Sequence, residues 1–421
     1  MATILTLIIF IATYILIISE KVHQTVASMF GGILLILLGI MHQEEAISSI
    51  DFNTLGLLVG MMIIIEIIKG TGLFQYLAIK AAKIAKGKPI TILIYLSIVT
   101  AIASAFLDNV TTILMVLPLT FIIADTLGVS SVPFLMSQIL ISNIGGASTL
   151  IGDPPNILIG SAAKFGFNDF IFNVSPVVIF VAIVTITIFY FIYRKELVVP
   201  LEVQQRILEF SPSKLLENLK MIKRSVFVLG ITIIGFVFHQ QFSLEAATVA
   251  LGGAGLLLII TNEHPAKILK EVEWPTIFFV IGIFVLVSGI EKVGIIEMLS
   301  NYLIKIVAGD ISVLTIIILW VGGIGSAFLG NIPFVVTMIP VVKHIEVQTG
   351  LSVDPLWWAL ALGSCLGGNG NLFGSAANIA AVNIYKNSGK NFSFLDFFKV
   401  GFPIMLVSLG ISTIYIYWFL I

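Results

Sequence analysis

The sequence predicts an all-α polytopic membrane protein, with about 10 transmembrane helices and two re-entrant hairpins arranged as an inverted repeat. Three observations predict this class. Of the 421 residues, 58% are hydrophobic and only 11% are charged, whereas a soluble domain carries about 25% charged residues. Apolar stretches of membrane-spanning length follow one another along the chain. Polar and glycine motifs of the first half recur in the second half at one constant spacing.

The remaining composition excludes several other functions. The net charge is −1, so the chain offers no basic surface for nucleic acid. Cys365 is the single cysteine, which excludes an intrachain disulfide and a thiolate metal cluster. The sequence contains no P-loop lysine motif. We therefore expect neither an enzyme nor a bound cofactor, and the energy for any transport must come from an ion gradient or from a separate ATPase subunit.

Transmembrane helices need roughly 20 mostly apolar residues. The stretches that approach this length are 3–19, 22–41, 52–69, 170–193, 222–239, 245–261, 275–290 and 395–421. We expect each of them to cross the membrane.

Four further apolar stretches are interrupted near their middles. Polar tips break the stretches 90–121 and 312–342, and we expect re-entrant hairpins there. Glycine-rich polar runs break 132–164 and 355–386, which should be helices that unwind within the membrane. Such irregular backbone is tolerated at membrane depth only where it is buried in protein or lines a wet cavity.

Lysine and arginine in short loops indicate which side of the membrane each loop faces. The longest polar segment, 194–224, contains seven of them and should be a cytoplasmic connector. The loop 42–51 contains none and should lie outside. Threading the chain from these two points gives ten crossings and two hairpins, with both termini outside. We expect a multi-pass protein in the lipid bilayer of the inner (plasma) membrane.

The two halves of the chain are related by a shift of 222 residues. Segment 104–109 aligns with 326–331, and 142–156 aligns without a gap with 364–378. The matching positions are polar residues and glycines, which shared apolar composition does not explain. Five crossings separate equivalent segments, so the second copy is inverted. Inverted repeats with broken helices that meet at the midplane are typical of secondary transporters.

This repeat divides the chain into three parts. Residues 1–193 contain the first span and the first repeat, 194–224 form the connector, and 225–421 form the second repeat. Each repeat contains one hairpin and one broken helix.

The interruptions bring helix N-termini, which suit anions, and amide and hydroxyl oxygens, which suit Na⁺, to one region. The candidate residues for binding a small ion or solute are Asp108, Asn109, Thr111, Thr112, Asn143, Gly145, Gly146, Ser148, Thr149, Asp153, Asn156, Asn331, Gly367, Gly368, Asn369, Asn371, Ser375 and Asn378. Among them Asn109, Thr149, Asn331 and Asn371 are candidate ligands of a coupling Na⁺ ion. The alternative is that these polar groups only cap the broken helix ends.

Asp108 is the most informative of these residues, because a carboxylate deep in an apolar stretch costs several kcal/mol unless it is paired, hydrated or protonated. Burial favours the protonated form, whereas a bound cation or nearby N–H groups favour the charged form. This competition suits an exchanger of protons for another ion. Asp153 follows the first glycine-rich run and either joins the same site or caps the helix that starts at Pro154.

These motifs resemble the ion transporter superfamily, in particular its branch of arsenite-efflux permeases, pink-eyed dilution (P) proteins and Na⁺/H⁺ antiporters. The resemblance covers nearly the whole chain and lies in the segments 104–112, 143–156, 331–340, 359–370 and 394–403. It implies a homodimer and elevator-type alternating access. In the related sodium–carboxylate transporters the tips and unwound segments bind Na⁺ and substrate, and the matching segments here are 108–112, 145–149, 330–333 and 367–371.

One departure from the P-protein pattern bears on function. The P-protein pattern looks like Asp-Asn at both hairpin tips, but the second tip here is Gly330-Asn331. Asp108 is therefore the only acidic residue at a hairpin tip. The first interpretation is an antiporter that exchanges arsenite, antimonite or Na⁺ for protons. The alternative within transport is Na⁺-coupled carriage of a di- or tricarboxylate. The alternative from another class is an ion channel or a non-transporting membrane receptor.

The threading predicts that Gln43 faces outside and Gln205 faces the cytoplasm. Single cysteines at these positions, in a chain with Cys365 replaced by alanine, can be tested with a membrane-impermeant maleimide. Gln43→Cys should react in intact cells, and Gln205→Cys only after lysis. Reaction of Gln205→Cys in intact cells would contradict the threading.

Overall fold

The computed structural model describes residues 2–19, 21–210 and 219–421, so part of the predicted connector 194–224 lies outside the described residues. The first half contains α1 (Ala2–Ser19), α2 (Gln24–Leu37), α3 (Gln43–Ser48), α4 (Phe52–Lys69), α5 (Leu73–Ile84), α6 (Pro89–Phe106), α7 (Asn109–Leu127), α8 (Val132–Gly146), α9 (Pro154–Ala163), α10 (Phe167–Asn173) and α11 (Ser175–Tyr193). The connector contains α12 (Leu201–Leu208).

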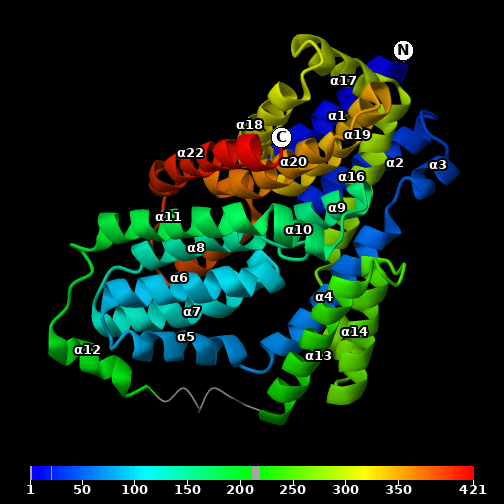
Figure 1. Ribbon diagram of the computed structural model, residues 1–421. Coiled ribbons are helices and arrows are strands. Elements are labelled where there is room, and N and C mark those ends of the chain that lie inside the picture. The colour runs from blue at the N-terminus through cyan, green and yellow to red at the C-terminus, as the bar shows by residue number, and fades with distance from the viewer. Residues whose placement is uncertain (1, 20, 211–218) are drawn as a thin grey trace.

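The second half contains α13 (Leu219–Phe238), α14 (Ala246–Thr261), α15 (Pro265–Lys270), α16 (Trp274–Lys292), α17 (Ile295–Ile306), α18 (Ile311–Leu329), α19 (Asn331–Thr349), α20 (Asp354–Gly367), α21 (Ala376–Asn387) and α22 (Phe394–Phe419). Two short 3₁₀ turns, Gly368–Gly370 and Leu372–Gly374, join α20 to α21. All regular structure in the described part of the chain is helical, which confirms the predicted all-α class (Figure 1).

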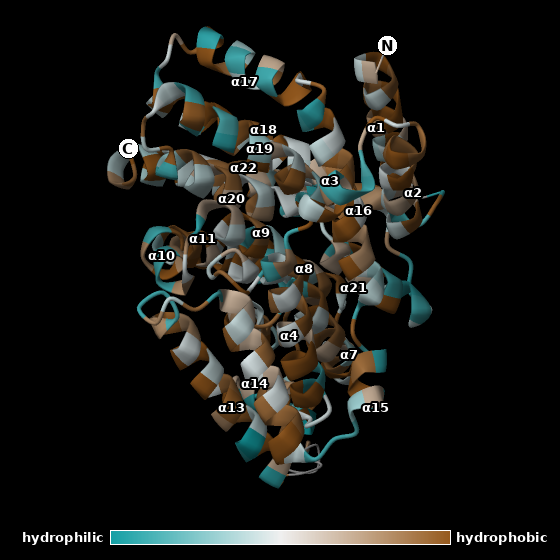
Figure 2. Cartoon of the chain, turned by 90° about the vertical axis from the view of Figure 1, so that its right-hand side faces the viewer, coloured by the Kyte–Doolittle hydropathy of each residue, from teal (hydrophilic) through white to brown (hydrophobic). Residues whose placement is uncertain are grey.

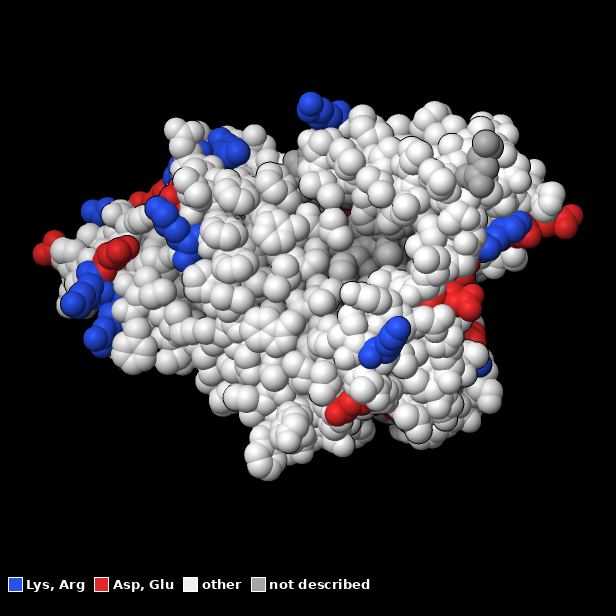
Figure 3. All heavy atoms as spheres, turned by 90° about the horizontal axis from the view of Figure 1, so that it is seen from above, with Lys and Arg blue, Asp and Glu red and all other residues white. Residues whose placement is uncertain are grey.

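The helices have the length and composition that a membrane requires. Within the described residues nine are long and apolar enough to cross one, namely α1, α4, α6, α7, α11, α13, α16, α18 and α22. Figure 2 shows mostly hydrophobic residues along the helices and hydrophilic ones in loops and at helix ends. On the face in Figure 3, charged side chains gather mainly towards two ends and leave a broad uncharged area between them. A polytopic membrane protein is confirmed.

Two predicted spans differ from the observed helices. The stretch 22–41 contains α2, which has only 14 residues, because the chain turns at Gly39, where φ is +70°. At 1.5 Å per residue, α2 is about 21 Å long, which is short for a hydrocarbon core of about 30 Å. The stretch 170–193 begins inside α10, and the chain bends at Val174 before α11 starts.

The internal repeat is more extensive than the sequence motifs indicate. Each of the helices α2 to α9 begins 222 residues before a helix of the second half; α4, for example, begins at Phe52 and α16 at Trp274. The packing is reciprocal as well, because α2 packs against α16 while their counterparts, α14 and α4, pack against each other. We call α2, α4, α14 and α16 the frame helices.

The hairpins and broken helices form a second group, which we call the core unit. It consists of the first hairpin (α6, α7), the first broken helix (α8, α9), the second hairpin (α18, α19) and the second broken helix (α20, α21). The same hydrogen bond fixes each hairpin to its broken helix. Ser104 Oγ donates to the carbonyl oxygen of Ser142 at 2.6 Å, and Ser326 Oγ donates to that of Ser364 at 2.6 Å.

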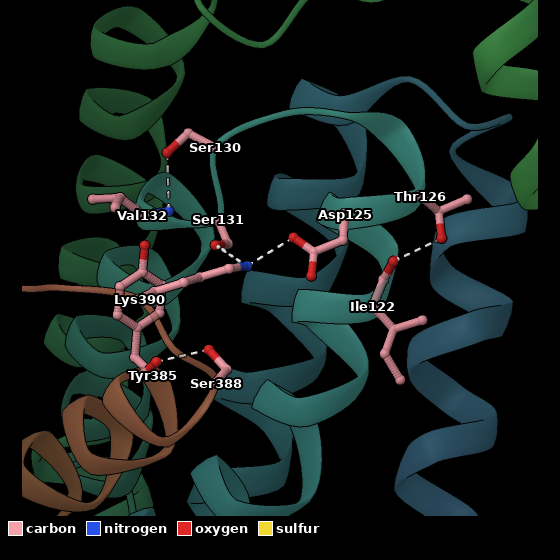
Figure 4. A network of polar contacts seen from close by, with 9 residues as sticks. All are labelled: Ile122, Asp125, Thr126, Ser130, Ser131, Val132, Tyr385, Ser388 and Lys390. Atoms are coloured by element: carbon pink, nitrogen blue, oxygen red, sulfur yellow. Dashed lines mark hydrogen bonds and ion pairs between the residues drawn. The ribbon is translucent and has the colours of Figure 1, made fainter.

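Lys390 joins the two repeats at the base of the first hairpin (Figure 4). It lies in the loop after α21, and its Nζ donates to Asp125 Oδ1 at 2.7 Å and to Ser131 Oγ at 3.0 Å. The ammonium also lies 5.6 Å from the ring centre of Phe121 and 5.8 Å from that of Tyr385. The second broken helix is thus fastened to the end of the first hairpin, away from its tip.

The closest approach inside the core unit occurs at two equivalent glycines. A Cβ atom on Gly145 would overlap the backbone carbonyl of Ala101 in α6, and a Cβ atom on Gly367 would overlap that of Gly323 in α18. Because backbone cannot move aside as a flexible side chain can, only glycine lets these helices pack at this distance.

We therefore expect Gly145→Ala and Gly367→Ala each to lower stability by about 1–3 kcal/mol, the usual range for overpacking. Gly368→Ala is the control, because its Cβ would meet nothing closer than Ser375 Cβ at 3.4 Å. The measurement is the thermal unfolding midpoint in detergent. A loss in the control as large as in the two variants would contradict this account.

Candidate functional site

Four helices begin at breaks in the core unit, and the site is built from their N-termini. The residues immediately before α7, α9, α19 and α21 are Asp108, Asp153, Gly330 and Ser375. Each N-terminus presents unpaired N–H groups and a partial positive charge. In α7 the Asp108 side chain caps the helix by accepting from the N–H of Thr111 at 2.7 Å.

Each hairpin tip contacts the start of the other repeat's second half-helix. Asn109 Nδ2 at the first tip lies 3.4 Å from Ser375 Oγ, before α21. Asn331 Nδ2 at the second tip donates to Asp153 Oδ1 at 3.1 Å, before α9. The two contacts are equivalent under the 222-residue shift. They place the four breaks in one region, related by an approximate two-fold axis.

Asp153 was left with two interpretations by the sequence, and the structure shows its partner. The side chain makes no capping hydrogen bond to α9. Its carboxylate instead accepts from Asn331 and is 1% exposed. Asp153 therefore belongs to the contact between the first broken helix and the second hairpin.

Asn143 connects three of the breaks. Its Nδ2 donates to Asn369 Oδ1 at 2.9 Å and to Asn378 Oδ1 at 2.8 Å. Its Oδ1 accepts from Asn109 Nδ2 at 3.0 Å. All four side chains are buried, so this amide network holds the first hairpin tip and both broken helices together.

Asparagines also satisfy the backbone at the two unwound turns. Asn156 Nδ2 donates to the carbonyl of Thr149 at 2.8 Å, and its counterpart Asn378 Nδ2 donates to that of Asn371 at 2.9 Å. Cys365 occupies the position equivalent to Asn143, and its Sγ donates to Asn156 Oδ1 at 3.4 Å.

Several predicted residues also support the breaks. Ser148 Oγ donates to the Gly145 carbonyl at 2.6 Å, and Thr149 Oγ1 donates to the Ala105 carbonyl. Gly368 begins the turn after α20, and its carbonyl accepts from Asn378 Nδ2 at 2.8 Å.

A small cavity opens between the core unit and the frame helices. Its lining is Gln24, Leu58, Met61, Met62, Ile65, Asp108, Asn109, Val110, Ile151, Asp153, Pro154, Ile157, Glu273, Thr276, Asn331, Ile332, Ser375 and Ala376. Its volume is about 60 Å³. Three of the lining residues are carboxylates, and none of these described residues is lysine, arginine or histidine. We call it the central cavity.

Only part of the predicted site lines this cavity. The residues that do are Asp108, Asn109, Asp153, Asn331 and Ser375. The other predicted residues, Thr111, Thr112, Asn143, Gly145, Gly146, Ser148, Thr149, Asn156, Gly367, Gly368, Asn369, Asn371 and Asn378, are not in its lining. Among the described residues, no group of three or more His, Cys, Asp or Glu side chains has the arrangement of a metal site.

Glu273 is the cavity carboxylate that sequence reasoning missed. It lies at the start of α16, and its Oε2 accepts from Thr276 Oγ1 at 3.3 Å. An acidic residue at the end of a membrane span is ordinary, so nothing local distinguishes it. The available signal was the repeat, because Asp51 precedes α4 at the equivalent position.

Gly330 makes the second tip different in shape as well as in charge. Its φ is +85° and its ψ is 150°, a conformation that is essentially restricted to glycine. Asp108, at the equivalent position, has φ −65° and ψ 155°.

Gly330→Ala should lower stability by about 1–3 kcal/mol through backbone strain alone. Space is available, because the nearest atom to a Cβ atom there is Pro333 Cδ at 3.6 Å. Gly322→Ala in α18 is the matched control, since its Cβ would meet Gly363 Cα at 3.5 Å from a helical backbone. Denaturant unfolding in micelles measures both, and equal midpoints would show that the tip is unstrained.

Comparison with known proteins agrees with this architecture. A family model described as citrate transporter matches residues 14–363. A 46 kDa membrane protein of Mycobacterium leprae is 34% identical over 421 residues, covering 99% of this chain and 98% of that protein. The P protein of Mus musculus is 32% identical over 487 residues, covering 96% of this chain and 58% of the P protein.

A solved structure shares the fold. MtrF of Neisseria gonorrhoeae superposes with a TM-score of 0.62 at 12% identity, over 92% of this chain and 84% of that one. The resemblance to the ion transporter superfamily and its P proteins is confirmed. The chain is a multi-pass membrane transporter that belongs to the citrate transporter family.

Proposed function

We propose that this transporter is a secondary antiporter that exchanges a small cation such as Na⁺, or a small oxyacid such as arsenite or antimonite, for protons. The observation that carries the proposal is the lining of the central cavity. Asp108, Asp153 and Glu273 contribute carboxylates, and the described lining contains no cationic side chain. Such a cavity attracts cations and protons and repels free anions.

The surroundings of two of these carboxylates allow both protonation states. Removal from water favours the neutral acid, and a bound proton or cation offsets this cost. Asp108 and Asp153 directly precede α7 and α9, whose N-terminal partial charges favour the ionised form. A proton and a metal ion can therefore replace each other at these groups, which is the exchange step.

The size of the cavity favours a small ion. A single ordered water needs about 10–15 Å³, so a volume of about 60 Å³ holds roughly four waters or an ion with part of its hydration shell. Among the predicted Na⁺ ligands, Asn109 and Asn331 line this cavity. Thr149 donates its hydroxyl to the Ala105 carbonyl, and Asn371 Oδ1 accepts from the N–H of Phe373 at 3.3 Å.

We propose further that the core unit moves as one body across the frame, in the manner of an elevator. The amide network ties the first tip to both broken helices, and the hydrogen bond from Asn331 to Asp153 ties the second tip to the first broken helix. The central cavity lies on the boundary, with Asp108 and Asp153 on the core unit and Glu273 on the frame. Movement along this boundary would carry the bound ion with the core unit.

Na⁺-coupled carriage of a carboxylate is the second candidate, and one observation favours it. Helices α19 and α21 begin after the uncharged residues Gly330 and Ser375, so their N-termini are not neutralised by a carboxylate and suit an anion. The description of the family as citrate transporters points the same way. A cation held by Asp108 and Asp153 would have to accompany such an anion.

We expect Asp108→Asn to abolish flux driven by an imposed pH gradient in proteoliposomes, because the amide keeps the size of the side chain but does not titrate. The candidate substrates are Na⁺, arsenite and citrate, each tested with pH and Na⁺ gradients. Asp310→Asn is the matched control, because Asp310 also caps a helix, by accepting from the N–H of Ser312 at 2.9 Å, but is exposed outside the cavity.

The substrate pattern separates the candidates. Proton-driven Na⁺ or arsenite flux that requires Asp108 supports exchange. Citrate flux that requires a Na⁺ gradient and does not respond to an imposed pH gradient would contradict exchange and support the second candidate.

A further inference from the structure

Two larger cavities lie between the frame and the core unit, both at the start of α4 and one of them also at the end of α16, away from the central cavity. One has a volume of about 610 Å³ and is lined by Asp51, Phe284 and Val287, among others. The second has a volume of about 780 Å³ and is lined by Asp51, Thr54 and Ala246, among others. We call them the outer cavities, because the threading places the adjoining loop 42–51 outside.

The outer cavities are lined by repeat counterparts of the central cavity. Seven residues of the frame helices or directly before them line the central cavity, namely Gln24, Leu58, Met61, Met62, Ile65, Glu273 and Thr276. Under the 222-residue shift, five of their equivalents line an outer cavity, namely Asp51, Thr54, Ala246, Phe284 and Val287, and the other two, Val280 and Ile283, do not. The frame therefore presents two equivalent surfaces to the core unit, and only one of them now faces the hairpin tips.

The two surfaces share their chemistry. Glu273 Oε2 accepts from Thr276 Oγ1 at 3.3 Å, and Asp51 Oδ2 accepts from Thr54 Oγ1 at 2.7 Å. In each case an acidic residue precedes a frame helix, with a threonine three residues later. Asp51 also caps α4 through Oδ1, which accepts from the N–H of Asn53 at 2.9 Å.

We propose that Asp51 is the outer counterpart of Glu273, the frame carboxylate that completes the ion site when the core unit occupies the outer position. This assignment rests on the proposed function. Asp108 and Asp153 would travel with the ion, Glu273 would face them in the inner position, and Asp51 would face them in the outer one.

This arrangement has a physical rationale. The core unit can carry a bound cation in both directions only if the free energy of the bound ion is similar in the inner and outer positions. A large difference would trap the ion in one of them. Two carboxylates from the core unit and one from the frame give the site the same count of negative groups at each end. A frame with a carboxylate at one end only would hold the ion there.

Other charged groups face these carboxylates and are part of the prediction. Around Asp51 the outer cavities contain Glu45, Glu291, Lys292 and Lys343 on one side and Lys164, His239 and Glu245 on the other. Around Glu273 they are Asp108 and Asp153, with Lys69 at the end of α4. These neighbours are unchanged in Asp51→Asn and in Glu273→Gln.

The test measures flux in vesicles of known orientation while Na⁺ and pH are varied on one side at a time. Asp51→Asn should raise the external half-saturating Na⁺ concentration about tenfold or more, because one favourable charge interaction near the ion is lost. The internal half-saturating Na⁺ concentration should change little. Glu273→Gln should do the reverse. Asparagine caps a helix as well as aspartate does, so Asp51→Asn removes the charge and keeps the cap.

Two matched controls separate this effect from general surface charge. Glu45→Gln changes an acid in the same outer cavity whose repeat counterpart, Lys267, does not line the central one. The hydrogen bond from Lys292 lowers the pKa of Glu45, so this control removes a charge that is present in the assay. Glu271→Gln is the inner control, since Glu271 is exposed and lies outside the central cavity. Glu271→Gln should behave as wild type on both sides, and Glu45→Gln should shift the external Na⁺ dependence much less than Asp51→Asn does, since Glu45 lies on α3 and not directly before a frame helix.

A second measurement does not depend on flux. Thr276→Cys paired with Val110→Cys should accept a short bismaleimide in the position seen here, because both residues line the central cavity. The equivalent pair, Thr54→Cys with Ile332→Cys, should be cross-linked in a separate fraction of the same preparation. Cross-linking of the first pair alone would overturn the proposal.

The outcomes distinguish this proposal from the function on which it rests. If Asp51→Asn leaves the external dependence unchanged, or shifts both sides equally, Asp51 is only a helix cap and the proposal is wrong. If Asp108→Asn keeps full pH-driven exchange, the proposed function fails instead, whatever the cross-linking shows.

Discussion

Where a helix unwinds inside an apolar bundle, its backbone N–H and C=O groups lose their helical partners and find no water to replace them. The centre of this protein depends on how these groups obtain hydrogen bonds. Asparagine side chains replace the missing water. Asn156 and Asn378 each donate to carbonyls that an unwound turn has freed. Leaving a buried carbonyl without a partner costs about 1–3 kcal/mol of stability. Several unpaired carbonyls together would make the broken conformation less stable than a continuous helix or an unfolded segment. The breaks, and with them the cavity between the tips, are stable because these asparagine side chains supply the missing hydrogen bonds.

The supporting contacts are symmetric, whereas the charges are not. The tip asparagines, the serines between hairpin and broken helix, and the asparagines at the turns all occur in pairs. Asp108 and Asp153, however, correspond to Gly330 and Ser375 under the 222-residue shift. Within the core unit, the first repeat therefore brings negative charge to the site and the second brings uncharged helix ends, whereas the frame carboxylate Glu273 comes from the second repeat. In the proposed mechanism, the matched packing is what gives the core unit two positions of similar energy, and the mismatched charge is what selects the solute.

The sequence predicted the breaks well because they violate the local pattern. Asp108-Asn109 and Gly330-Asn331 interrupt apolar stretches, and α7 and α19 begin at those asparagines. It could not indicate which of the polar residues line the cavity, because an asparagine that lines a cavity and one that bonds backbone look identical in sequence. Asn143 and Asn331 illustrate this difference, which tertiary packing alone decides. The short α2 was missed because apolar residues continue past Leu37, where the helix ends, to the turn at Gly39.

Each hairpin tip contacts the broken helix of the other repeat, and this arrangement has a consequence for biosynthesis of the chain. Asp153 receives its hydrogen bond from a residue 178 positions later, and Asn109 contacts one 266 positions later. At about 5–20 residues per second, a ribosome needs roughly 10–40 seconds to extend the chain from Asp153 to Asn331. During that interval Asp153 lacks its partner Asn331, although Asn156 can already bond the carbonyls of its own broken turn. The contacts that close the site between the two repeats can therefore form only after the second repeat has been synthesised.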